Sequence, residues 1–182
     1  LFILYYKIPI HRSVPNPLPR IEKNSDFIST LSSLPTEQQH KLAKKFISGV
    51  IHLSDNPRLH PLLELLERPA CSTDDISKAR SIAQSVYVET GPHSDIADVK
   101  YNCQATHFIA QAVLACTAQD SKGAATSHLA HKVANYCRMA QTCSSMGQSG
   151  EDPDFSNAES GYNRIAQEQI NIVNQFLESQ GS

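Results

Sequence analysis

The side chains best suited to chemistry in this sequence lie in the stretch SHLAHKVANYCRMA, residues 127–140. His128 and His131 stand three residues apart, a spacing that places both imidazoles on one face of a helix. Cys137 and Cys143 follow within the next twelve residues. Histidine and cysteine are ligands that zinc prefers in proteins, so the stretch raises the question of a metal site.

A helical wheel separates these histidines from the cysteine. At about 100° per residue, one side of the helix collects apolar side chains, namely Leu129, Val133, Tyr136, Cys137 and Ala140. The opposite side collects His128, His131, Lys132, Asn135 and Arg138. We therefore expect Cys137 to lie in the core and the five polar residues to form a solvated, basic helix face.

A metal site remains an alternative interpretation of His128 and His131. Structural zinc takes four ligands and catalytic zinc usually takes three from the protein, so other helices would have to supply the rest. His107 and Asp120 are conceivable, although no spacing rule selects them. Lys132 lies beside His128 on the wheel, where its charge would oppose a bound cation. We accordingly predict no cofactor and no metal, with His128 and His131 as the ligands if one is bound.

The remaining nucleophiles and acids form no recognisable catalytic pattern. The chain has five cysteines, which are Cys71, Cys103, Cys116, Cys137 and Cys143, and no C-x-x-C occurs. In a helical domain most of them should be small buried hydrophobic residues, which favours a reducing compartment such as the cytoplasm. The sequence has no G-x-S-x-G motif and no glycine-rich phosphate loop. Helix capping and solvation explain the acidic pairs at residues 74–75 and 151–152.

Charge and hydropathy argue against nucleic-acid and membrane partners. The formal net charge is -2, which provides no general basic field. The densest basic run, HKLAKK at residues 40–45, has its lysines on the polar flanks of an amphipathic helix. The first residues, LFILYYKIPI, contain an apolar run of six, far below the ~20 residues needed to span a bilayer.

The hydrophobic periodicity predicts an all-α protein, a compact bundle of five to six helices with an extended N-terminal arm. The first long helix is expected after LPTEQQ with Thr36 as its N-cap, and a short one around LLELLER. Further helices are expected near residues 72–89, 96–118, 127–140 and 157–177. We expect residues 21–182 to form a single helical domain.

Residues 1–20 are expected to form the arm. Their second half holds three prolines, Pro15, Pro17 and Pro19, which remove backbone donors and disfavour helix. An apolar run such as LFILYY should not remain in water alone, so we expect the arm to pack on its own domain or on a neighbouring copy.

Two central segments, FIAQAVLACTAQ and AATSHLAHKVANYCRMA, are rich in alanine and cysteine. Small side chains let helix axes approach closely, toward the short end of the usual packing distances. We therefore expect a tight bundle with few large internal pockets. Such a bundle would bind other molecules on its outer surface.

The run from Ala124 to Ala140, preceded by ATHFIAQAVLACTAQ, resembles a helical family of bacterial immunity proteins that accompany polymorphic or contact-delivered toxins. The resemblance lies in the alanine-rich helix pair and in an A-T-x-H-x-x-H motif, here Ala125, Thr126, His128 and His131. The family's usual acidic residue before the second histidine is replaced by Ala130. The resemblance implies a compact cytoplasmic helical protein that binds and blocks a toxin domain.

The leading hypothesis is therefore a non-enzymatic protein-interaction module, in its narrower form an immunity protein. Its partner would contact His128, His131, Lys132, Asn135 and Arg138, and protonation of the histidines would strengthen binding to an acidic partner below about pH 6.5. The first alternative is a metal-dependent helical enzyme built on the two histidines. The second is a homo-oligomeric structural subunit joined by exchanged N-terminal arms.

Overall fold

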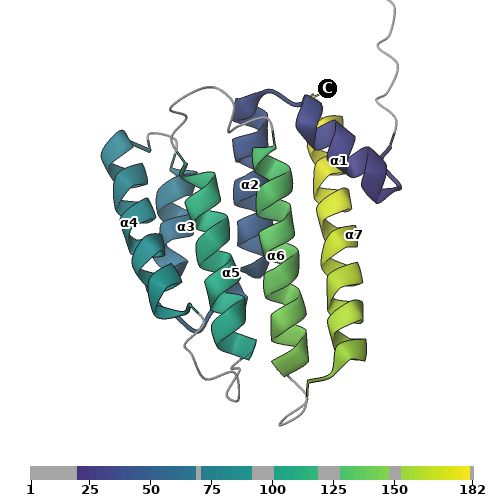
Figure 1. Ribbon diagram of the computed structural model, residues 1–182. Helices are drawn as coiled ribbons and strands as arrows, with labels where there is room; N and C mark the ends of the chain where they lie inside the picture. The colour runs from purple at the N-terminus through teal and green to yellow at the C-terminus, as the bar shows by residue number, and fades with distance from the viewer. Residues whose placement is uncertain (1–19, 69–70, 92–100, 119–127, 148–152, 181–182) are drawn as a thin grey trace, which may run out of the picture.

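The computed structural model describes residues 20–68, 71–91, 101–118, 128–147 and 153–180 (Figure 1). These described residues form seven α-helices and one short 3-10 helix, with no strand among them. The helices are α1 (Asn24–Ser33), α2 (Thr36–Val50), η1 (Ile51–Leu53), α3 (His60–Glu67), α4 (Thr73–Glu89), α5 (Tyr101–Cys116), α6 (Leu129–Met146) and α7 (Phe155–Gln180). The predicted all-α class is confirmed for this part of the chain.

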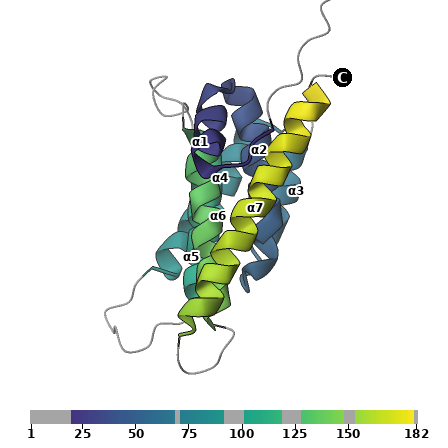
Figure 2. The ribbon, with the colours of Figure 1, turned by 90° about the vertical axis from the view of Figure 1, so that its right-hand side faces the viewer.

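Four helices stand side by side in Figure 1, in the order α4, α5, α6 and α7, while α2 and α3 lie behind them. The most extensive contacts join α5 to α6, α6 to α7, α2 to α6 and α4 to α5. The view onto α7 in Figure 2 shows this long helix crossing the bundle obliquely. The short helix α1 contacts both α6 and α7. As a result, α6 has neighbouring helices on three sides.

Apolar residues at helical spacing supply most of the core. In α2, Leu42, Phe46 and Val50 are all fully buried or nearly so. In α4, the buried positions are Ala79, Ala83 and Val86. The helix α5 lies between α4 and α6, in agreement with its apolar circumference, and its buried positions are Ala105, Thr106, His107, Ile109, Ala110, Ala112, Val113 and Cys116.

The start of α4 agrees with the predicted capping. The backbone N–H of Asp75 donates to Ser72 Oγ at 3.1 Å, and the backbone N–H of Ser72 donates to Asp75 Oδ2 at 3.1 Å. This capping box satisfies donors that the first turn of a helix leaves free. These hydrogen bonds to Ser72 lower the pKa of Asp75. At the start of α2, by contrast, Thr36 is the first helical residue and Pro35 precedes it.

Small residues bring α6 and α7 close together at one point. A Cβ added to Gly161 of α7 would lie 3.0 Å from Ser145 Cβ and would overlap Ser145 Oγ. The two backbones can therefore approach at this point because position 161 has no side chain.

Two expectations need correction, and a third concerns residues that the structure does not describe. The predicted number of helices is too low, because α1 was not foreseen: its sequence NSDFISTLSS is rich in serine and buries only Phe27 and Leu31. Tyr162, which its spacing from Ala158 and Ile165 predicts on the buried face of α7, is 39% exposed. The N-terminal arm, apart from Arg20, lies outside the described residues. In the described part of the chain, no helix is long and apolar enough to cross a membrane.

Candidate functional site

Four of the five core positions predicted for residues 127–140 are confirmed in α6, while the fifth, Tyr136, is half-buried. Leu129, Val133, Cys137 and Ala140 are buried, each with 5% exposure or less. The neighbouring helices α5, α2 and α7 cover these positions and the adjoining flanks of α6. Only one narrow side of the helix faces solvent.

That solvent-facing side carries a row of four exposed residues, His128, Lys132, Asn135 and Met139, here called the α6 stripe. They recur at spacings of four, three and four residues, which keeps them on one side of a helix. Met139 is 42% exposed and is the apolar member of the row. The stripe thus combines a cation, an imidazole, an amide and a thioether on a fixed helix.

His131 lies half-buried at the edge of the stripe. Its Nε2 accepts a hydrogen bond from the Asn135 side-chain amide at 3.2 Å. Burial is the main factor that lowers the pKa of His131, and the charges of Arg138 and His128 lower the pKa further. At neutral pH the imidazole is therefore uncharged, with its Nε2 lone pair available to Asn135.

His128 connects the stripe to α1. Its Nδ1 is hydrogen-bonded to Ser32 Oγ at 3.1 Å, across the contact between the end of α1 and the start of α6. His128 precedes the first helical residue, so its ring is held by this contact and not by the helix itself. This hydrogen bond is one of the contacts that join the start of α6 to α1.

Arg138 does not belong to the exposed face, and its predicted exposure is wrong. The side chain is 1% exposed. Its Nε donates to Gln169 Oε1 at 2.7 Å, and its Nη1 donates to Asn24 Oδ1 at 2.9 Å and to Tyr162 Oη at 3.4 Å. The guanidinium carbon also lies 5.0 Å from the ring centroid of Phe27 and 5.6 Å from that of Tyr162. Arg138 is thus a buried link between α1, α6 and α7.

The burial of Arg138 follows from α1, the helix that the sequence did not reveal. On the wheel, Arg138 lies at the edge of the polar side, beside positions that contact α7. Asn24 and Phe27 of α1 close over it from outside. Without α1 the same guanidinium would face water, which is what the wheel alone predicts.

Three of the five thiols are unsuited to nucleophilic work at neutral pH. Burial raises the pKa of Cys116 to about 11 and that of Cys143 to about 11. Burial also raises the pKa of Cys137, with a further contribution from Cys116. Since the thiolate is the reactive form, these thiols behave as small core side chains.

The ligand set of the metal hypothesis does not assemble in the described residues. No group of three or more histidine, cysteine or acidic side chains in this part of the chain is arranged to hold a metal ion. His107 is buried between α4 and α5, where its ring stacks on Tyr87 with centroids 4.4 Å apart. Asp120 lies outside the described residues.

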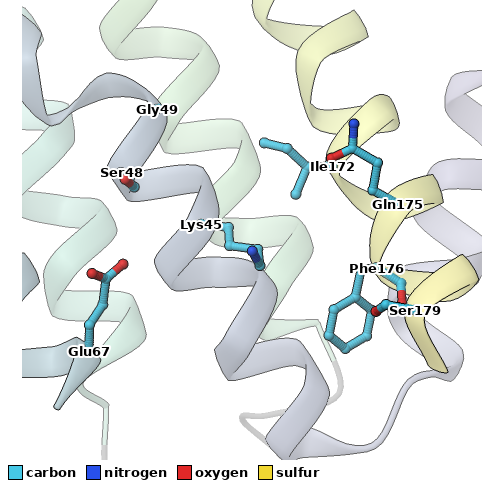
Figure 3. A pocket seen from close by; sticks show the side chains of 8 residues that line it. All are labelled: Lys45, Ser48, Gly49, Glu67, Ile172, Gln175, Phe176 and Ser179. Atoms are coloured by element: carbon cyan, nitrogen blue, oxygen red, sulfur yellow. The ribbon is translucent and has the colours of Figure 1, made fainter.

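Two open surface grooves that described residues line lie beside α7. The larger, here called the α2 groove, runs from the end of α3 across α2 to α7 and has a volume of about 520 Å³ (Figure 3). Its lining residues are Lys45, Ser48, Gly49, Glu67, Ile172, Gln175, Phe176 and Ser179. The smaller, of about 320 Å³, lies where Arg20, Ile21 and Glu22 meet another flank of α7.

Sequence reasoning also missed Met139. The signal was present, because Met139 follows Asn135 by four residues and falls within about 20° of His128 on the wheel. Methionine is among the residue types that are most often buried, so residue type alone places Met139 in the core and not on the polar side.

Comparison with known proteins does not name a relative. No protein-family model, no curated protein sequence and no solved structure matches the chain. The function must therefore be argued from the helices and side chains themselves.

Proposed function

We propose that this chain is a non-enzymatic protein-binding module whose α6 stripe docks on an acidic face of a partner protein. The observation that carries the proposal is the placement of α6, which is held on three sides while its fourth side exposes the four residues of the stripe. A surface that is already ordered loses little conformational entropy when a partner binds.

The chemistry of the stripe supports an acidic partner. The helix α6 contains no aspartate or glutamate among its 18 residues, and Lys132 is exposed on it. A row with one cation and no acidic residue favours encounter with negative charge and disfavours other basic surfaces. Met139 adds a flexible apolar contact of a type enriched at protein interfaces.

The narrower form of the proposal is an immunity protein, and the A-T-x-H-x-x-H resemblance supports it. The partner would then be a toxin domain, and one copy of this chain would block one copy of the toxin by covering its functional surface. Arg138 has no place in this contact because its side chain is buried. Its role is to hold α6 in position.

Site-specific photo-crosslinking in the cell that encodes the chain tests the proposal and captures the partner in the same step. A photoreactive phenylalanine analogue replaces Asn135 in one variant and Gln84, an exposed residue of α4, in the control. We expect a discrete adduct from position 135 whose crosslinked peptide contains aspartate or glutamate, and no such adduct from position 84. The same adducts from both positions, or none from position 135, would contradict the proposal.

A further inference from the structure

The α2 groove is independent of the α6 stripe and contains features of a docking site for an extended chain. In Figure 3, Ile172 and Phe176 extend from α7 toward α2, and Lys45 lies on the α2 side between the two helices. Gln175 and Ser179 are exposed on the α7 rim. The groove therefore has an apolar wall and a polar rim, and its volume lies within the ~300–1,000 Å³ range of ordinary ligand sites.

Gly49 leaves space in this groove, and neither packing nor backbone conformation requires a glycine at this position. It lies in the last turn of α2, where alanine would be the better helix former. A Cβ added at this position would meet nothing within 4 Å, so packing does not require a glycine there. The backbone at Gly49 is also helical, and a left-handed conformation does not explain the residue.

We propose that the α2 groove holds the apolar side chains of residues 1–10 of the same chain, LFILYYKIPI. The first support is the point where the described chain begins. The backbone N–H of Ile21 donates to Asn174 Oδ1 at 2.9 Å, and Asn174 Nδ2 donates to the Ile21 carbonyl at 3.0 Å. This two-point contact fixes the chain against α7 on the flank of the smaller groove, and the next residue of α7, Gln175, lines the α2 groove.

The length of the intervening chain is the second support. Residues 11–19, which lie outside the described residues, number nine and can span up to about 30 Å when extended. An α-helix with its side chains is about 10–12 Å across, so this segment is long enough to pass over α7 and reach the groove. Its prolines favour the extended form that such a crossing needs.

The third support is chemical fit. The segment begins with six apolar or aromatic residues, which match the wall formed by Ile172 and Phe176. The groove lining has two charged residues, of which Glu67 can pair with Lys7, the charged side chain of the segment, while Lys45 has the same charge as Lys7. The backbone N–H and C=O groups of an extended segment can form hydrogen bonds with the polar side chains of the rim.

A single-tryptophan probe tests this docking in the full chain. The chain has no tryptophan, so Tyr5→Trp introduces a fluorophore that reports only on the segment. The blocking variant Gly49→Gln/Ser179→Gln fills the groove from both walls, and Gly49→Ala/Ser179→Ala is its matched control. Gly49→Gln alone serves as a second blocking variant, and far-UV circular dichroism verifies that each protein is folded.

We expect the tryptophan emission of the Tyr5→Trp chain to be shifted to shorter wavelength than that of a free peptide of residues 1–18 with the same change. The glutamine variants should return the emission to the peptide value, the alanine control should retain the shift, and dilution should not alter it. Emission equal to that of the peptide would overturn the proposal, as would a shift that the glutamine variants leave unchanged. A shift that disappears on dilution would also overturn it, because a second copy would then supply the segment.

Discussion

Replacing Gln169 by leucine and Arg138 by methionine, singly and together, measures how strongly the buried polar contact joins α6 to α7. Gln169 is fully buried, and its Oε1 accepts from Arg138 Nε at 2.7 Å. No carboxylate pairs with Arg138 in the described part of the chain, so neutral acceptors carry the contact. A hydrogen bond to a charged group contributes about 1.5–3 kcal/mol.

The expected values follow from what each change leaves behind. Gln169→Leu leaves Nε of the buried cation as a second unmet donor beside Nη2 and removes the hydrogen bond from Gln169 Nε2 to the Ala134 carbonyl, which together should cost about 3 kcal/mol. Arg138→Met removes the cation and its desolvation penalty but leaves Gln169 Oε1 unpaired, which should cost about 2 kcal/mol. In the double variant neither partner is left unpaired, so the loss should fall short of the sum by about 2 kcal/mol.

Urea unfolding followed by far-UV circular dichroism supplies these values, provided that the slope of free energy against urea is unchanged. Gln167→Leu, at an exposed position of the same helix, is the matched control and should change the free energy of unfolding by less than about 0.5 kcal/mol. If the two core changes add to within about 0.5 kcal/mol, Arg138 and Gln169 do not interact in a buried contact. The explanation for the position of α6 would then be wrong.

Three further predictions concern the same fold. Gly161→Ala should lower the free energy of unfolding by about 1–3 kcal/mol, because its Cβ meets Ser145; an unchanged urea midpoint would show that α6 and α7 are further apart. Ser72→Ala should cost about 1 kcal/mol through loss of the capping box, and Ser72→Asp should retain most of that stability in the same assay. Burial lowers the pKa of His107 below 6.5, so the unfolded chain binds the proton more readily and stability should decline as the pH falls below 6.5. His107→Phe should reduce that decline between pH 7.5 and pH 5, and an identical decline in both proteins would exclude His107 as a cause.

The sequence predicts those elements whose hydrophobic spacing is strong. The stripe of Leu42, Phe46 and Val50 identifies the buried side of α2, and the alternation of small and apolar residues identifies that of α6. The Ser72 and Asp75 pair predicts where α4 begins, because a capping box depends on residues close together in the sequence. In each case the information that determines the structure is local.

The errors arise where burial depends on a distant segment. Arg138 has the residue type and the wheel position of a surface side chain, and it is buried because Asn24 and Phe27 of α1 cover it. Periodicity within α6 holds no information about α1. Met139 is the opposite case, because it is an apolar residue that lies exposed in the polar row. Its spacing from His128 and Asn135 already places it on the exposed side of the helix. Residue type misleads at both positions, whereas the cover by α1 explains Arg138 and the helical spacing explains Met139.

The most direct test of the protein-binding account is the dissociation constant for the partner identified by crosslinking, measured by titration calorimetry with wild-type chain and with Met139→Asp. The substitution places a negative charge in the α6 stripe, opposite the acidic face expected on the partner. We predict that the dissociation constant rises at least about tenfold, equivalent to about 1.4 kcal/mol, while Gln84→Asp leaves it unchanged. Equal dissociation constants for wild type and Met139→Asp would contradict the assignment of the α6 stripe as the binding surface.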